Sequence, residues 1–275
     1  MGEQLKPAPG GSKLAYIPRI GWIKRIDPWW GLVLVVILLA TLLVTAQADP
    51  FRNILIFVRD GILITIIVTI SAFLIVLVLG LFGGLGRLSK NPFIRFPASL
   101  YIEVIRGIPL LVQLIWWYFA FPVVIQQVGE WLNIAALVGF RANPIVMAIL
   151  GLAICYGAYM SEIYRAGIQS IPKGQMEASR SLGMSYFQSM RHVILPQAVR
   201  VILPPVGNEA IALLKDSSLV SVVAVADLTR RGREFMAVNF NPIEVWTMVA
   251  LLYLIMTLLL ARLVAWIEKR SHFER

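Results

Sequence analysis

The feature that most restricts the fold is a run of 24 residues, from 61 to 84, that contains no charged side chain. A helix needs about 20 consecutive apolar residues to cross the hydrocarbon core of a bilayer, and this run is long enough. The runs are continuous rather than alternating, which favours helices over the strands of a membrane β-barrel. The sequence therefore predicts an all-α, polytopic membrane protein of about six transmembrane helices, at 29–46, 61–84, 107–125, 143–167, 203–226 and 243–266.

The composition agrees with a membrane location. Hydrophobic residues make up 59% of the chain and charged residues 15%, with a mean hydropathy of +0.78. Soluble domains are nearer half apolar and a quarter charged, so an ordinary soluble enzyme and a disordered chain are both excluded. The single cysteine, Cys155, excludes an internal disulfide framework, and the two histidines, His192 and His272, lie far apart in the sequence. We expect no metal site and no cofactor.

The distribution of basic residues predicts the orientation. Six spans place both termini on one side, together with the loops at 86–96 and 165–200, and that side carries 17 Lys and Arg residues. The other side carries 7, with Arg106 left uncounted at a helix entry. Because basic residues mark the cytoplasmic side, we expect both termini in the cytoplasm, with residues 1–28 as an N-terminal tail. The net charge of +10 is then explained without a nucleic-acid partner.

The loop between the fourth and fifth predicted spans contains helix signals. Pro172 suits the first turn of a helix, Gly183 suits a left-handed stop, and Ser185 with Gln188 fits a capping box. Apolar side chains then recur at helical spacing from 187 to 194. The pattern predicts two short helices hinged at Gly183, with an apolar face that needs either the membrane surface or a partner protein.

The same loop carries a resemblance to a known family. Glu177-Ala178-Ser179, Gly183 and Leu195-Pro196 resemble the EAA loop of inner-membrane permeases of binding-protein-dependent ABC importers, in which Ala is usual at the position of Ser179. Segments 106–114, 168–175 and 213–220 resemble the polar amino acid permeases of the histidine/glutamine type. The resemblance covers about residues 57–268, with the loop at 170–196 inside it. It makes the helix at 29–46 an addition to a five-helix core.

The resemblance implies how such a chain is driven. The loop would form coupling helices on an ATPase subunit, with Glu177 at the contact, Ala178 and Ser179 small enough for close approach, and Gly183 at the bend. The alternative for Gly183 is a helix stop without a coupling role. The chain has no Gly-x-x-x-x-Gly-Lys-Ser/Thr phosphate loop, so we expect no enzyme activity of its own.

The partners implied by the resemblance follow from the same mechanism. They are a dimer of ATP-binding subunits, a soluble amino-acid-binding protein, and a second permease copy or a homologous permease, all at the bacterial inner membrane and in contact with its lipid. The sequence does not choose between a homodimer and a heterodimer of permeases, and it does not name the amino acid.

Polar side chains inside the predicted spans are candidate substrate contacts, because they are costly in lipid. Glu162 lies late in the fourth span, and Asn208 and Glu209 lie early in the fifth. A zwitterionic amino acid needs acceptors for its ammonium group and donors for its carboxylate, and an asparagine offers both. Each candidate has a structural alternative: Glu162 pairs with Arg165 at i, i+3, and Asn208 and Glu209 lie at a dimer seam or gate.

Other charged residues suit structural roles. Lys215 and Asp216 interrupt the fifth span, and we interpret them as a helix break or gate held by mutual charge compensation, ahead of substrate contact. Glu103 and Arg106, at i, i+3, are interpreted as a helix-end ion pair. The arginines that follow the fifth span, Arg230, Arg231 and Arg233, either meet an acidic face of a binding protein or solvate a loop.

Two other functions compete with a permease subunit. A self-sufficient secondary transporter would have inverted repeats with broken helices in both halves, and only the fifth span is interrupted here. A scaffold without a substrate path would not need polar residues in the middle of that span. Together with the resemblance, which implies import of polar amino acids, these residues favour a permease subunit that forms the translocation path.

Overall fold

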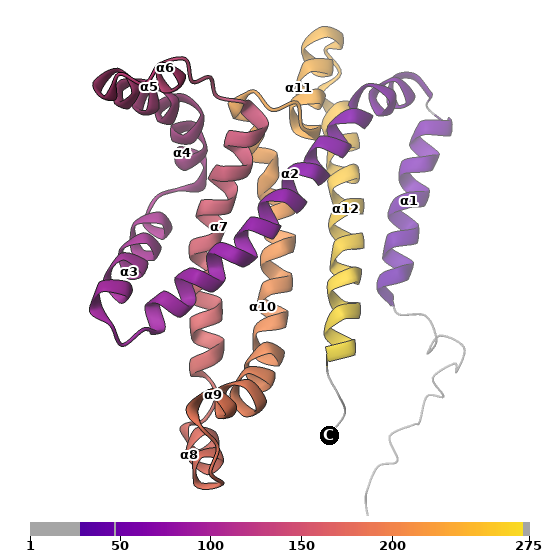
Figure 1. Ribbon diagram of the computed structural model, residues 1–275. Helices are drawn as coiled ribbons and strands as arrows, with labels where there is room; N and C mark the ends of the chain where they lie inside the picture. The colour runs from indigo at the N-terminus through magenta and orange to yellow at the C-terminus, as the bar shows by residue number, and fades with distance from the viewer. Residues whose placement is uncertain (1–27, 47, 272–275) are drawn as a thin grey trace, which may run out of the picture.

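The computed structural model describes residues 28–46 and 48–271, and all of these residues lie in helices or in the segments that connect them (Figure 1). The predicted tail at 1–28 falls outside the described residues except for Pro28. The helices are α1 (Pro28–Ala46), α2 (Ala48–Leu88), α3 (Pro92–Gly107), α4 (Leu110–Ile115), α5 (Phe121–Leu132), α6 (Ala135–Val138), α7 (Pro144–Gln169), α8 (Lys173–Ser181), α9 (Tyr186–Ser189), α10 (Leu195–Asp216), α11 (Leu228–Asn239) and α12 (Pro242–Ser271). The prediction of an all-α fold is confirmed.

Five stretches of the described chain are long and apolar enough to cross a membrane. They are Trp29–Ala46, Asp49–Leu88, Leu110–Leu132, Pro144–Gln169 and Pro242–Arg270. The third consists of α4 and α5, joined by the π-helical segment Trp116–Ala120. α10 runs between α7 and α12 through the same layer of the bundle, and we treat it as the sixth membrane helix although its charged residues lower its hydropathy (Figure 1).

Two predicted boundaries are wrong. The third span was expected to start at Gly107, but the chain breaks between α3 and α4, where Ile108 is extended (φ −106°, ψ 131°). The cause is Pro109, which disfavours helical geometry in the residue before it. The fifth span was expected at 203–226, but α10 starts at Leu195 and gives way after Asp216 to a 3₁₀ segment, Ser217–Val223.

α2 crosses the bundle diagonally and packs most extensively on α7 (Figure 1). Glycines on α2 make this crossing close. A Cβ atom added at Gly84 would lie 2.8 Å from the Ser161 carbonyl oxygen, and one added at Gly80 would lie 2.4 Å from Met160 Cγ. Small residues four positions apart let two membrane helices approach until their backbones touch, which strengthens van der Waals packing.

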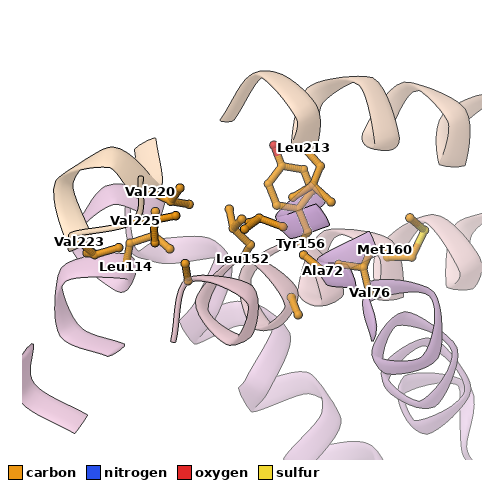
Figure 2. Packing of buried hydrophobic residues seen from close by; sticks show 13 residues of the cluster. Ala72, Val76, Leu114, Leu152, Tyr156, Met160, Leu213, Val220, Val223 and Val225 are labelled. Carbon is orange, nitrogen blue, oxygen red and sulfur yellow. The ribbon is translucent and has the colours of Figure 1, made fainter. Parts of the chain in front are cut away.

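The main core fills the space beside this crossing. Figure 2 shows Ala72 and Val76 of α2 near Met160 of α7, and the ring of Tyr156 next to Leu213 of α10. Leu114 of α4 and the valines of the 3₁₀ segment and the turn after it extend the same cluster. The core therefore fixes α2, α4, α7 and α10 relative to one another.

The remaining helices lie around this core. α1, the additional N-terminal helix, packs on α2 and α12, with Val33 and Val36 against Leu258. The guanidinium of Arg262 also lies 5.1 Å from the centre of the Trp29 ring. α8 and α9 project from one end of the bundle, and α5, α6 and α11 lie at the other end (Figure 1).

The α2–α7 crossing can be tested with a single side chain. We expect Gly84→Val to destabilise the folded chain by about 1–3 kcal/mol, since the new carbons would press on backbone atoms of α7 that cannot rotate away. Thermal unfolding in detergent measures the loss. Gly31→Val on α1 is the control, because a Cβ atom there meets nothing within 4 Å. Equal stability of the two variants would contradict this account of the crossing.

Candidate functional site

A polar cavity of about 420 Å³ lies where α3, α4, α7 and α10 meet. It contains two carboxylates, one guanidinium and two phenol groups among a few apolar side chains. The lining residues are Arg106, Gly107, Ile108, Pro109, Leu110, Cys155, Tyr156, Tyr159, Glu209 and Asp216. The cavity is the candidate site because it holds groups of both signs of charge inside a membrane-spanning bundle. Charged groups are costly to place inside a membrane, so those that are present usually serve a function.

The acidic wall of the cavity comes from α10. Glu209 and Asp216 are seven residues apart, which is about two helical turns, so both face the same side. Both side chains are half-buried. The Tyr156 hydroxyl of α7 donates a hydrogen bond of 2.7 Å to Asp216 Oδ2, which fixes this carboxylate while Glu209 stays available.

The helix break predicted at Lys215 and Asp216 is present, but the charge pairing predicted to hold it is not. The α-helix does end at Asp216, and the Ser217 hydroxyl donates to the Leu214 carbonyl oxygen at 2.7 Å, as expected of a side chain at a break. However, no ion pair of the described residues joins Lys215 to Asp216. Adjacent positions on a helix point about 100° apart and do not face each other, so the pair cannot compensate itself.

The opposite wall is the break between α3 and α4, and Gln113 holds it together. The Gln113 side chain is 5% exposed, and its Nε2 donates hydrogen bonds of 2.8 Å to the carbonyl oxygens of both Ile105 and Ile108. The Ile105 carbonyl also accepts the Ile108 N–H at 3.4 Å, but without Gln113 the buried Ile108 carbonyl would be left unpaired. Gln113 thereby fixes the segment that carries Arg106, whose guanidinium lies 5.1 Å from the centre of the Tyr159 ring.

A cluster of charges ties α2, α3 and α7 together below the cavity. Arg87 of α2 pairs with Glu162 at 3.1 Å and with Glu103 at 2.6 Å, and Arg165 also pairs with Glu162. The structural alternative for Glu162, pairing with Arg165, is therefore present, and Glu162 does not line the cavity. The predicted ion pair between Glu103 and Arg106 is wrong, because Arg87 reaches Glu103 from the neighbouring helix.

Asn208 does not line the cavity either. Asn208 and Lys215 are exposed and lie on a common face of α10, about 100° around the helix from Glu209 and Asp216. Within the described chain, no hydrogen bond or ion pair is formed by either side chain. The structure thus separates two neighbours that the sequence presented as one site: Glu209 enters the cavity and Asn208 points to another surface.

The loop at 170–196 contains the predicted hinge. α8 ends in a Schellman motif, in which the Gly183 N–H bonds to the Arg180 carbonyl and the Met184 N–H to the Ser179 carbonyl, and Gly183 has φ +84°. The capping box follows, with Ser185 and Gln188 each bonding the other's backbone N–H. Both signals identified in the sequence are confirmed.

The second helix of the loop is longer than predicted. α9 continues without interruption through the π-helical segment Met190–Ile194 into α10. Pro196 lies in the first turn of α10, where the preceding π-helical turn accommodates a nitrogen that has no hydrogen to donate. One continuous helical path therefore connects the hinge at Gly183 with the acidic wall of the cavity.

Two of the three EAA residues lie on the exposed side of α8. Glu177 and Ala178 are exposed, whereas Ser179 is buried and its hydroxyl donates to the Met176 carbonyl oxygen at 2.9 Å. Large apolar side chains beside the hinge are also exposed: Leu182 at 82%, Tyr186 at 64% and Phe187 at 70%. We call Leu182, Tyr186 and Phe187 the loop apolar patch. Contiguous apolar surface of this kind marks an interaction site.

The arginine cluster after α10 is mostly engaged within the chain. Arg230 and Arg231 each bond Glu234 at 2.9 Å, and Arg231 also pairs with Asp60 of α2. These hydrogen bonds, that from Arg230 first, lower the pKa of the Glu234 carboxyl. Arg233 is exposed and donates to the Ser221 hydroxyl at 3.2 Å. The cluster therefore anchors α11 on α2, and leaves less free charge for a partner than the sequence suggests.

Sequence reasoning missed the part of the cavity formed by the break between α3 and α4. Arg106 was assigned to a helix-end ion pair, and the backbone from Gly107 to Pro109 was placed inside a span. The signal was present, since a glycine two residues before a proline marks a break in an otherwise helical pattern.

A bundle of membrane helices that encloses a polar cavity and exposes a capped helical hairpin at one end defines a membrane permease. Residues 76–272 match the family described as binding-protein-dependent transport system inner membrane component. The chain belongs to this family, and it is a multi-pass inner-membrane protein.

Two named relatives are similar to most of this chain. The glutamine transport system permease protein GlnP of Escherichia coli (strain K12) is 41% identical over 194 residues, which are 70% of this chain and 83% of GlnP. The arginine transport system permease protein ArgU of Corynebacterium glutamicum is 35% identical over 256 residues, which are 90% of this chain and 80% of ArgU.

Solved structures of ABC transporters have a similar fold. A crystal structure of an amino acid ABC transporter with histidines has 39% sequence identity and a TM-score of 0.69, covering 78% of this chain and 94% of that one. The inward-facing MetNI methionine ABC transporter, at 21% identity and a TM-score of 0.60, supports the fold alone. The prediction of an amino acid ABC permease subunit is confirmed, and these findings favour it over a secondary transporter.

The role of Gln113 in closing the helix break is testable. We expect Gln113→Leu to destabilise the chain by about 1–3 kcal/mol, because it leaves the Ile108 carbonyl group beside the cavity without a donor and removes one of the two donors to the Ile105 carbonyl. Thermal unfolding in detergent measures the change. Gln127→Leu is the matched control on an exposed position of α5. If both variants unfold at the wild-type temperature, Gln113 does not hold the break.

Proposed function

We propose that a polar amino acid passes through the cavity of this permease, delivered by a soluble amino-acid-binding protein and driven by ATP hydrolysis in separate ATP-binding subunits. The observation that carries this proposal is the pairing of a guanidinium with two carboxylates in one cavity of a membrane bundle. That set of charges matches a zwitterion. Relatives named for the transport of glutamine and arginine support the substrate class.

Each side of the cavity suits one end of the substrate. The guanidinium of Arg106 is the donor for the α-carboxylate, since arginine binds carboxylates through charge-assisted hydrogen bonds. Glu209 and Asp216 accept from the ammonium group and from a cationic side chain. The rings of Tyr156 and Tyr159 add aromatic faces that attract cations. Glu162 supports the path indirectly. It belongs to the ion-pair cluster below the cavity, where it pairs with Arg87 and Arg165.

The hinged loop is the contact with the ATP-binding subunit. Glu177 and Ala178 on α8 and the loop apolar patch are exposed together, as a docking surface requires, and Gly183 fixes the angle between them. A push on α9 passes along the continuous helix into α10 and moves Glu209 and Asp216. ATP binding then shifts the cavity between two states, because it favours the state in which the ATP-binding subunits are closed.

A second permease, identical or homologous, completes the path. Asn208 and Lys215 are exposed on one face of α10, and a lysine and an asparagine in mid-membrane need a protein or aqueous surface opposite them. We assign this face to the seam between the two permeases. Both termini and the hinged loop lie on the cytoplasmic side, in keeping with the excess of basic residues there.

Substitution of Glu209 tests the assignment of the cavity. We expect Glu209→Gln to reduce uptake of arginine at least tenfold and uptake of glutamine less than threefold, since hydrogen bonds to charged groups contribute about 1.5–3 kcal/mol. Uptake by the whole transporter in proteoliposomes gives both rates. Asn208→Ala, on the neighbouring face, is the control and should affect the two substrates equally. Equal loss of both substrates in Glu209→Gln would assign Glu209 a structural role.

Substitution of Gly183 tests the coupling role of the loop. Gly183→Val forces a β-branched residue to φ +84°, which costs about 1–2 kcal/mol, and bends the hairpin away from its partner. We expect uptake to fall at least tenfold while ATP hydrolysis and membrane insertion persist. Gly174→Val is the matched control, at a helical glycine of the same loop with open space around it. Unchanged uptake in Gly183→Val would refute the coupling role.

A further inference from the structure

α3 is held less firmly in the bundle than α7, although both helices line the polar cavity. Of the 16 residues of α3 only Ile102 is fully buried, whereas α7 buries twelve of its 26 residues. Figure 1 shows α3 at the edge of the bundle, connected to α2 and to α4 by non-helical segments. An element with few buried side chains opens at a lower free energy than the core beside it. α3 is therefore the wall of the cavity that moves most easily.

The first half of α3 is fixed. The Asn91 side chain caps the helix, because it accepts a hydrogen bond of 2.9 Å from the Phe93 N–H. A Cβ atom added at Gly86 of α2 would lie 2.9 Å from Ala98 Cβ, so α2 and this half of α3 are in close contact. A movement of α3 would pivot here and displace the second half, which carries Arg106.

Two polar contacts hold the second half of α3 in place. The Tyr101 hydroxyl donates a hydrogen bond of 2.7 Å to the Ile154 carbonyl oxygen of α7. Arg87 of α2 pairs with Glu103 at 2.6 Å and with Glu162 of α7 at 3.1 Å, so it joins α3 to α7. We call the Tyr101 hydrogen bond and the Arg87–Glu103 ion pair the α3 latch.

The α3 latch lies between the polar cavity and the end of the bundle that carries α8. Glu103 precedes the lining residue Arg106 by about one turn of α3. Glu162 follows the lining residue Tyr159 by about one turn of α7, and α7 continues from there toward α8. The latch therefore holds α3 and α7 together one helical turn beyond the cavity wall.

The ion pair of the α3 latch can open without leaving a buried charge unpaired. The Glu103 side chain is 66% exposed, so water takes the place of its partner. Glu162 keeps Arg165 as a partner, and Arg87 keeps Glu162. Ion pairs with an exposed partner contribute little to stability, so this contact is easily broken and formed again.

We propose that α3 is a gate between the polar cavity and the cytoplasm, and that the α3 latch holds this gate closed. The inference rests on the proposed function, which supplies the orientation and the substrate. When the latch opens, the second half of α3 moves away from α7 and takes Arg106 with it. The substrate carboxylate then loses its donor as the way out forms. A substrate bound to both Arg106 and Glu209 conversely favours the closed state, because only that state offers both contacts.

Cys155 can report the opening of this gate. It is the only cysteine of the chain, it lines the cavity, and it is 3% exposed. A membrane-impermeant methanethiosulfonate is added to membrane vesicles that contain the whole transporter, either inside-out or right-side-out, without amino acid. Mass spectrometry of the peptide that contains Cys155 gives the rate of its modification from each side.

We expect Glu103→Gln and Tyr101→Phe each to raise this rate by about threefold or more in inside-out vesicles, as the loss of one ion pair or hydrogen bond allows. Both substitutions remove a contact of the α3 latch and nearly preserve the size of the side chain. Glu234→Gln is the matched control, because it removes two ion pairs at the other end of the bundle, and it should leave the rate unchanged. In right-side-out vesicles no variant should change the rate.

Unchanged modification of Cys155 in both latch variants would overturn the gate. Faster modification from the external side, or an equal increase in Glu234→Gln, would also overturn it, since either result would show a general loosening of the bundle. The assay contains no substrate, so its outcome decides the gate alone. A failure of the wild-type transporter to import any amino acid would instead refute the proposed function.

Discussion

Inside a bilayer no water is available to the backbone, so every break in a membrane helix must be closed by a group of the protein itself. This constraint explains the arrangement of the site. The break between α3 and α4 is closed by Gln113, which donates to two carbonyl groups, and the end of α10 is closed by the Ser217 hydroxyl. Both breaks border the same cavity, because Gly107 to Pro109 and Asp216 are among its lining residues, together with side chains of α7.

The second physical element is the continuity of α9 with α10. A loop that hung from two flexible connections would absorb a push from outside the membrane. Here a Schellman motif and a capping box fix the bend between α8 and α9, and the helix beyond it runs unbroken to the acidic wall of the cavity. The close packing of α2 on α7 supplies a rigid support for α10, whose Leu213 belongs to the same core.

Local signals in the sequence predicted local structure well. Gly183, Ser185 and Gln188 have conformational preferences that depend only on their near neighbours, and the structure shows all three in the predicted roles. Contacts between helices could not be predicted in the same way. Arg87 is 16 positions from Glu103 and 75 from Glu162, so nothing in the local pattern revealed that it would take Glu103 from Arg106. With that pairing, Arg106 becomes available to the cavity.

The same distinction applies to α10, where neighbouring residues serve different surfaces. At 100° per residue, Glu209 and Asp216 point into the polar cavity, Asn208 and Lys215 point to an exposed face, and Gly207 and Ala210 face apolar side chains of α2 and α12. A helix with one acidic, one polar and one apolar face has too low a mean hydropathy to be recognised as a span, although it lies at the centre of the bundle. Its composition reflects three different surroundings: the polar cavity, an exposed face, and the apolar side chains of α2 and α12.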